Sequence, residues 1–183
     1  KFYREFSGAV ISTTIDKYLY VTVKKHNEIF NEKFRICYSK TEQKNFIDEI
    51  ENGVARECLK LLKINYPIYI STVSDIPSST GLGSSSSFAV GLLYALHTLN
   101  GESVSAGQLA EEACEVEINC LKNPIGKQDQ YAAAYGGLNC FNFRKNNLVD
   151  IEHIIPPKNG IKEIFDSLML FWTGFQRSSH KIL

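Results

Sequence analysis

The stretch of the chain best suited to chemistry is a glycine- and serine-rich segment at residues 75–88, Asp-Ile-Pro-Ser-Ser-Thr-Gly-Leu-Gly-Ser-Ser-Ser-Ser-Phe. Its glycines allow backbone φ values that other residues resist, so successive N–H groups can turn toward one anion. Its serines open a predicted helix, whose free N–H groups and positive end favour phosphate. Serine hydroxyls can also cap the helix, donate to phosphate oxygens or coordinate magnesium. The pattern predicts a phosphate-binding loop; the structural alternative is a flexible loop before an ordinary serine-capped helix.

This loop differs from three common motifs of similar composition. A Walker A loop needs Gly-Lys-Ser/Thr at its end, and no lysine follows Gly83. The dinucleotide-binding motif G-x-G-x-x-G does not fit, because Ser86 stands at the third glycine position. The chain contains no G-x-S-x-G, so a hydrolase nucleophile elbow is unsupported.

Glu117 is the first candidate carboxylate. At about 100° per residue, it lies in the middle of the apolar face of a predicted helix over residues 105–121. The other members of that face are Ala110, Ala113, Cys114, Cys120 and Leu121, and the glutamates that project to the solvated side are Glu111, Glu112 and Glu115. An unpaired carboxylate among apolar side chains is costly. A metal ion would compensate Glu117, and so would a structural salt bridge.

Asp129 is the second candidate carboxylate. It follows Gly126-Lys-Gln at or just inside the start of a predicted helix. An aspartate in a first helical turn commonly serves only to balance the helix dipole. The functional interpretation is a carboxylate that orients an attacking hydroxyl and can deprotonate it. A phosphate cradle, a metal-binding carboxylate and such an aspartate form a minimal set for phosphoryl transfer, which relies on positioning and charge neutralisation.

Composition and charge limit the classes of partner that the chain is expected to bind. Twenty Lys and Arg residues balance twenty Asp and Glu residues, and this neutrality argues against a broad electrostatic footprint for nucleic acid or membrane. No apolar run approaches the roughly 18 residues of a membrane span, and no signal peptide is visible. Five cysteines without a C-x-x-C pair predict reduced thiols in a cytoplasmic protein.

Hydrophobic periodicity and turn signals predict the elements that must position these residues. The predicted strands cover 9–15, 18–24, 34–38, 67–74, 138–144 and 148–155, and the predicted helices cover 43–63, 88–99, 105–121 and 128–135. Ser105 with Gln108 matches a capping box at the third helix. Strands and helices mix without regular βαβ alternation, which predicts an α+β fold. Pro156-Pro157 is the expected domain boundary.

Taken together, the loop and the two carboxylates resemble the GHMP kinases, the family of galactokinase, homoserine kinase, mevalonate kinase and phosphomevalonate kinase. Residues 77–87 are similar to its phosphate-binding motif P-x-x-x-G-L-G-S-S. The resemblance implies that the phosphates of ATP bind at Pro77, Ser79, Thr80, Gly81, Leu82, Gly83, Ser84, Ser85 and Ser86. It implies magnesium ligands at Ser85 and Glu117, and Asp129 as the catalytic aspartate near the substrate hydroxyl. The spacing from Glu117 to Asp129 is one residue longer than in mevalonate kinases.

Several segments resemble one subgroup of that family, the D-glycero-D-manno-heptose 7-phosphate kinases; they are 15–17, 55–59, 81–88, 126–137 and 171–177. The implied reaction transfers the γ-phosphate of ATP to the anomeric hydroxyl of heptose 7-phosphate. Another GHMP kinase, of fucose or galactose type, is the main alternative, and a non-catalytic nucleotide-binding module is a second. Arg177 is a candidate contact for a substrate phosphate, with an exposed surface arginine as the structural alternative.

The resemblance also implies the organisation of the chain and its partners. We expect a ribosomal-protein-like N-terminal ATP-binding domain at 1–156 and the start of a ferredoxin-like C-terminal domain at 157–183. The first strand and sugar-binding segment of the family have no counterpart before Lys1, and its C-terminal glycine-rich motif has none before Leu183. We therefore expect a fragment or a shortened chain. The expected ligands are ATP, Mg²⁺ and a sugar phosphate; a homodimer is allowed, and no nucleic-acid or membrane partner is expected.

Overall fold

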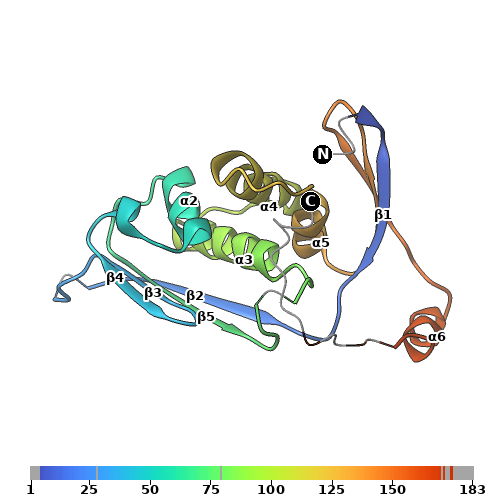
Figure 1. Ribbon diagram of the computed structural model, residues 1–183, viewed down its shortest axis with the longest axis horizontal. Helices are drawn as coiled ribbons and strands as arrows, with labels where there is room; N and C mark the ends of the chain where they lie inside the picture. The colour runs from blue at the N-terminus through green and yellow to red at the C-terminus, as the bar shows by residue number, and fades with distance from the viewer. Residues whose placement is uncertain (1–4, 28, 79, 170, 172–173, 175–183) are drawn as a thin grey trace.

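The computed structural model describes residues 5–27, 29–78, 80–169, 171 and 174, and its strands form two separate sheets (Figure 1). The larger sheet is mixed, in the order β2, β5, β3 and β4; these strands are Leu19–Lys25 (β2), Phe34–Cys37 (β3), Thr41–Lys44 (β4) and Ile68–Ser74 (β5). The smaller sheet is antiparallel, in the order β1, β6 and β7; these strands are Gly8–Thr13 (β1), Leu138–Phe143 (β6) and Val149–His153 (β7). The chain therefore leaves one sheet after β1 and enters the other at β2.

Helices cover one face of the larger sheet (Figure 1). They are η1 (a 3₁₀ helix, Ile47–Glu49), α2 (Gly53–Leu61), α3 (Ser84–Leu99), α4 (Ala106–Cys114), the π-helical segment η2 (Glu115–Cys120) and α5 (Gln128–Tyr135). The last helix, α6 (Gly160–Asp166), lies apart from the others in Figure 1. Mixed helices and strands of this kind confirm the predicted α+β class.

The main core lies between the larger sheet and α3. Strand alternation turns one set of side chains toward the helices, and α3 contributes the other; these fully or almost fully buried residues are Phe34, Ile36, Ile68, Ile70, Leu92, Leu93 and Leu96. Gly91 lets α3 approach β2 closely, because a Cβ atom there would lie 3.2 Å from Cγ2 of Val21. This packing fixes the direction in which the N-terminus of α3 points.

A second core holds α5 between α4 and the smaller sheet. The ring of Tyr131 on α5 makes edge-on contacts with Phe141 and Phe143 of β6, with centroids 6.0 Å away in each case. Ala110 and Cys114 of α4 complete the buried cluster. Aromatic pairs of this geometry add to the stabilisation from burial. The first turn of α5, which carries Asp129, is therefore attached to a rigid framework.

The predicted helix at 43–63 is wrong over about its first half. Residues 41–44 form the edge strand β4, and α2 begins only at Gly53, after Asn52, whose Oδ1 accepts a hydrogen bond from the Ala55 N–H at 3.0 Å. The cause is Glu42, which is buried and accepts the N–H groups of Glu51 and Asn52 at 2.6 and 2.9 Å. A long-range contact of this kind is invisible to a search for apolar periodicity.

The remaining elements agree with the predictions to within a few residues. Ser105 caps α4 by accepting the Gln108 N–H at 3.2 Å, but the Gln108 side chain donates to Glu112 instead of closing a capping box. Helix α6 was not predicted. The expected boundary at Pro156-Pro157 follows β7 and stays a prediction, as do the two domain ranges.

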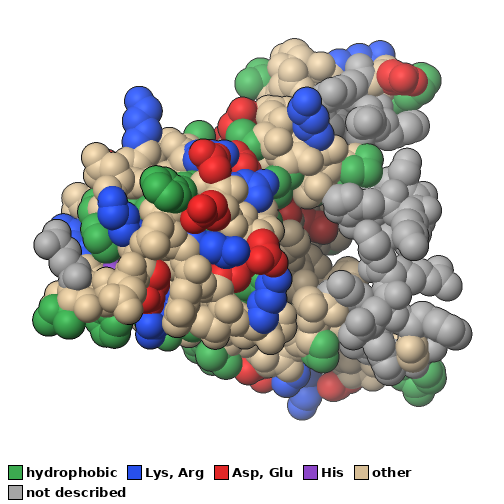
Figure 2. All heavy atoms as spheres, turned by 60° about the vertical axis from the view of Figure 1, so that its left-hand side comes forward, with side chains coloured by type: hydrophobic (Ala, Val, Ile, Leu, Met, Phe, Trp, Pro, Cys, Tyr) green, Lys and Arg blue, Asp and Glu red, His purple; other side chains and the backbone are tan. Residues whose placement is uncertain are grey.

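Surface charge is mixed on the side of the molecule shown in Figure 2, where acidic and basic side chains are interspersed over the helices. Among the described residues, no helix is both long enough and apolar enough to cross a bilayer. The five cysteines form no disulfide; Cys58 and Cys114 are buried, Cys37 and Cys140 are half-buried, and Cys120 is exposed.

A buried histidine held between two carboxylates ends α3. His97 is 4% exposed; its Nδ1 contacts Glu102 in the connection that follows, and its Nε2 lies 2.8 Å from Oε2 of Glu112 on α4. Burial by itself would lower the pKa of His97, but hydrogen bonds with Glu112 and Glu102 outweigh it, so the pKa is raised above its ordinary value. Both ring nitrogens thus contact carboxylates, and the contact with Glu112 ties α3 to α4.

The free energy of unfolding should depend on pH through His97. Because the pKa is higher in the folded protein, this stabilisation is fully present below the unfolded value of about 6.5 and is lost as the pH rises through the folded value. We expect His97→Gln to lower the free energy of unfolding by about 1 to 3 kcal/mol at about pH 5.5, and by less at about pH 8.5. Urea denaturation measures both, with His153→Gln on the exposed end of β7 as the control. Equal losses at the two pH values would contradict the assignment.

Candidate functional site

The glycine–serine loop connects β5 to α3 and leaves the N-terminus of this helix open. Gly81 and Gly83 have φ angles of 80° and 70°, in the left-handed region that side chains disfavour. Gly83 is the N-cap residue, and the first helical hydrogen bond runs from the Ser87 N–H to the Gly83 carbonyl at 2.9 Å. The N–H groups of the three serines before Ser87 therefore have no partner inside the helix. This end of α3 can receive an anion.

Behind the loop lies Glu117, which is 1% exposed. Its Oε1 accepts the hydroxyl of Ser85 at 2.6 Å, and its Oε2 accepts the hydroxyl of Ser86 at 2.6 Å and the side-chain amide of Gln130 at 2.6 Å. Ser85 is exposed, whereas Ser86 and Gln130 are buried. The carboxylate thus joins α3, η2 and α5, and its side-chain partners among the described residues are neutral donors in place of the cation of a salt bridge.

Glu117 lies in the π-helical segment η2, where the backbone N–H of residue i+5 reaches the carbonyl of residue i, as in the bond from Leu121 to Val116 at 3.0 Å. A π-helical turn contains one more residue than an α-helical turn and is frequent at functional sites. It explains why Cys120, predicted on the buried face, is exposed, since residues in a π turn advance by a smaller angle.

Asp129 lies directly in front of the loop. A Cβ atom placed on Gly83 would lie 3.7 Å from Cβ and 3.8 Å from Cγ of Asp129. The Asp129 side chain reaches solvent, yet the protein around it excludes enough water to raise its pKa above the usual aspartate value, against a smaller lowering by the Gln128 side chain. A carboxylate with a raised pKa is a better proton acceptor than an ordinary aspartate.

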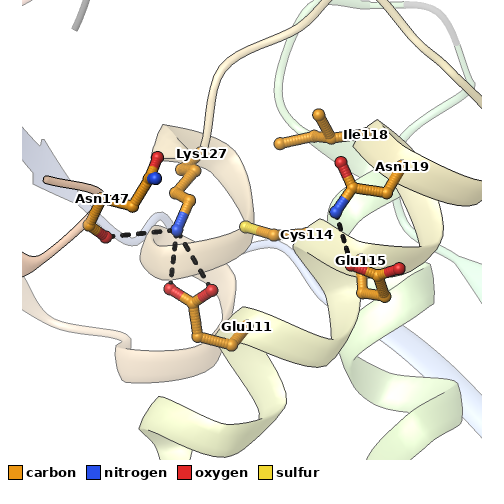
Figure 3. Close-up of a pocket in the computed structure, with 7 residues that line it drawn as sticks. All are labelled: Glu111, Cys114, Glu115, Ile118, Asn119, Lys127 and Asn147. Carbon is orange, nitrogen blue, oxygen red and sulfur yellow. Dashed lines mark hydrogen bonds and ion pairs between the residues drawn. The ribbon is translucent and has the colours of Figure 1, made fainter. Parts of the chain in front are cut away.

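An ion pair holds the residue before α5 in place. Lys127 Nζ lies 2.9 and 3.1 Å from the two carboxylate oxygens of Glu111 on α4 and 3.4 Å from the carbonyl of Asn147 (Figure 3). The same Glu111 carboxylate accepts the hydroxyl of Tyr131. A cavity of about 260 Å³ adjoins this pair and is lined by Glu111, Cys114, Glu115, Ile118, Asn119, Lys127 and Asn147, none of which was predicted to bind ATP. These contacts fix the start of α5 and, through it, Asp129.

The donor set fits a magnesium nucleotide. A serine hydroxyl and one carboxylate are hard oxygen ligands, and Mg²⁺ usually takes only one or two protein carboxylates and completes its shell with phosphate and water oxygens. Within the described part of the chain, no three His, Cys, Asp or Glu side chains gather as a self-sufficient metal cluster. Thr80 in the loop has a buried hydroxyl without a hydrogen-bond partner among the described residues, as a group awaiting a ligand would.

Most of the predicted site residues converge at this point. Ser85 and Glu117 are in contact, Asp129 faces Gly83, and Gly81, Leu82 and Ser84 surround the open helix end. The hydroxyl of Ser86 is turned inward to Glu117, which leaves its backbone N–H for a phosphate. Ser79 and Arg177 lie outside the described residues. Gln130 was missed, because a glutamine next to Asp129 carries no signal of burial in the local sequence.

The fold is an α+β domain in which the N-terminus of α3 is open to an anion. The buried carboxylate of Glu117 lies next to this helix end. Residues 49–137 match the family described as GHMP kinases N terminal domain. Residues 49–137 therefore form a GHMP kinase N-terminal domain, as the sequence motif predicted.

Three known proteins illustrate the likeness. A D-glycero-alpha-D-manno-heptose 7-phosphate kinase of Campylobacter jejuni is 30% identical over 188 residues, which cover 97% of this chain and 55% of that protein. A galactokinase of Pyrococcus furiosus is 27% identical over 180 residues, 93% of this chain and 48% of that protein. The crystal structure of a D-glycero-D-manno-heptose 1-phosphate kinase from Bacteriodes thetaiotaomicron gives a TM-score of 0.74 at 25% identity, covering 91% and 56% of the two chains. The chain thus spans about half the length of the curated relatives it matches.

Replacing Gly83 should disturb the loop through backbone strain. Gly83→Ala puts a side chain at a φ of 70° and is expected to lower the free energy of unfolding by about 1 to 2 kcal/mol. The new methyl group would also touch Asp129 and weaken binding of nucleotide at the helix end. Gly126→Ala is the matched control, because that glycine has open space around it. Urea denaturation and nucleotide titration measure the two effects, and identical behaviour of the two variants would refute the strain argument.

Proposed function

We propose that this chain is the nucleotide-binding catalytic portion of an ATP-dependent sugar kinase. One observation carries the proposal: the exposed Ser85 and the buried Glu117 meet at the open end of α3, and Asp129 lies next to Gly83. Phosphoryl transfer needs this combination of a phosphate cradle, a site for a divalent cation and a carboxylate near the acceptor hydroxyl. Membership of the GHMP kinase family supports the same reaction class.

In this proposal the backbone N–H groups of Ser84, Ser85 and Ser86 bind the phosphates of ATP, helped by the positive end of α3. Ser85 and Glu117 would hold Mg²⁺, which would neutralise charge on the phosphate oxygens during transfer. The two oxygens that would bind the ion are the Ser85 hydroxyl oxygen and Oε1 of Glu117, which lie 2.6 Å apart. Thr80 gains a partner for its buried hydroxyl from the same phosphates.

Asp129 accepts the proton of the attacking hydroxyl. As the new bond forms between the sugar oxygen and the γ-phosphorus, the bond from that phosphorus to the bridging oxygen breaks and ADP leaves. The proton of the hydroxyl passes to the Asp129 carboxylate. Because the pKa of Asp129 is raised by the protein around it, the proton is accepted more readily than by an ordinary aspartate.

For the sugar, the names of the relatives support a heptose phosphate, and we propose the anomeric hydroxyl of D-glycero-D-manno-heptose 7-phosphate as the acceptor. The heptose kinase of known structure is described as acting on the 1-phosphate, and another relative is a galactokinase. A galactose- or fucose-type substrate is therefore the second candidate. A cytoplasmic location and a role for Arg177 at a substrate phosphate belong to the same proposal.

The substrate is tested by measuring ADP release from full-length protein with a panel of acceptors. The panel contains heptose 7-phosphate, mannose, fucose, galactose and mevalonate, each with and without Mg²⁺. Magnesium-dependent turnover confined to heptose 7-phosphate is the expected result. Turnover on another sugar would retain the kinase and change the substrate, and no turnover on any compound would favour a non-catalytic nucleotide-binding module.

The role of Asp129 is tested by Asp129→Asn, which keeps the size of the side chain and removes its ability to accept a proton. We expect kcat to fall by roughly two to four orders of magnitude while ATP still binds. The acid side of the pH profile of the unmodified protein should lie above the ordinary aspartate value of about 3.9, because activity is lost as Asp129 is protonated. Asp48→Asn, at an exposed position on η1, is the control. Loss of ATP binding in Asp129→Asn would show that Asp129 has another role.

A further inference from the structure

The two oxygens of the Glu117 carboxylate have different surroundings. Oε2 accepts two hydrogen bonds from side chains that are almost fully buried, Ser86 at 3% and Gln130 at 0% exposed. Oε1 accepts one hydrogen bond from Ser85, which is exposed. Only the Oε1 side of the carboxylate therefore borders a region that a cation could enter.

Of the two donors to Oε2, Gln130 links the carboxylate to another helix. Its amide nitrogen must face Glu117, because a carboxylate offers only acceptors, and this leaves its own Oε1 buried without a partner among the described residues. An unpaired buried acceptor is costly, by about 1 to 3 kcal/mol in mutational data. A hydrophobic side chain of the same size would avoid that cost but would remove one donor from the buried Oε2 of Glu117. The glutamine is therefore tied to the needs of this carboxylate.

The position of Gln130 also connects the carboxylate with Asp129. The two residues are neighbours in the first turn of α5, one directed at Glu117 and the other at Gly83. The start of α5 is thereby bonded to the carboxylate behind the loop while it touches the loop in front. Residues that hydrogen-bond to a metal ligand orient it, and their loss typically weakens metal binding by 10- to 100-fold.

We propose that Gln130 is a positioning residue of the site, whose buried amide holds Oε2 of Glu117 so that the carboxylate meets a divalent cation through Oε1 alone. This inference rests on the proposed function of the site. It assigns Gln130 no contact with the nucleotide, the sugar or the cation. Ser86 acts on the same oxygen from α3, so the two donors together fix the rotation of the carboxylate about its last bond.

The test is the affinity of full-length protein for Mn²⁺ in the presence of a non-hydrolysable ATP analogue, followed by electron paramagnetic resonance of the free ion. Gln130→Met keeps the size of the side chain and removes the donor, and we expect it to weaken Mn²⁺ binding by about tenfold or more. Ser86→Ala removes the other donor to Oε2 and should also weaken Mn²⁺ binding. This variant tests the orientation of the Glu117 carboxylate if Gln130→Met does not fold. Asn139→Leu is the control, since Asn139 is another buried amide with an unpartnered oxygen but donates to the carbonyl of Gly136.

A second reading separates positioning from general destabilisation. At saturating Mg²⁺, Gln130→Met should recover most of the unmodified kcat, whereas Asp129→Asn should not. Mn²⁺ affinities of Gln130→Met and Ser86→Ala within twofold of the control would overturn the inference. If the unmodified protein neither binds Mn²⁺ with the nucleotide nor phosphorylates any sugar, the proposed function itself fails; if it does both and the variants match it, only the role of Gln130 is lost.

Discussion

A carboxylate kept out of water needs several strong donors around it, and the arrangement of this domain follows from that requirement at Glu117. The donors come from two other helices: Ser85 and Ser86 from the first turn of α3, and Gln130 from the first turn of α5. Three helices must therefore converge on one point. The packing of α3 on the larger sheet and the aromatic contacts of α5 with β6 hold the helices at the required positions.

This convergence also determines the electrostatics of the loop. The unpaired N–H groups of α3 lie beside the exposed Ser85, and α5 places Asp129 next to Gly83. Dipoles that are already oriented need little reorganisation when charge arrives, which is the main source of electrostatic catalysis. Ser86 and Gln130, which hold the carboxylate, are buried, whereas Ser85 and Asp129 are exposed. The buried side chains that support the site and the exposed side chains that could meet ligands therefore lie close together.

Local signals in the sequence predicted the loop, most strands and the start of α5, because these depend on glycine, serine capping and alternation along a short segment. Glu117 was correctly placed on a buried face, although Cys120 was not, since no local pattern reveals a π turn. The helix prediction at 43–63 did not allow for the buried Glu42, which accepts hydrogen bonds from the N–H groups of Glu51 and Asn52. The burial of Gln130 was not predicted, because it depends on a hydrogen bond to Glu117 in another helical segment. In each case burial of a polar side chain is decided by elements that are distant in sequence.

The π turn of η2 has a consequence for how such a chain can change over time. Inserting one residue into an α-helix normally rotates everything that follows by about 100° and would disrupt its packing. A π turn absorbs the additional residue locally. Leu121, just beyond it, still packs against Gly53 of α2, where an added Cβ atom would lie 3.0 Å from its Cδ2. A one-residue insertion or deletion at this turn can therefore leave both the Glu117 carboxylate and the contact of Leu121 with Gly53 in place.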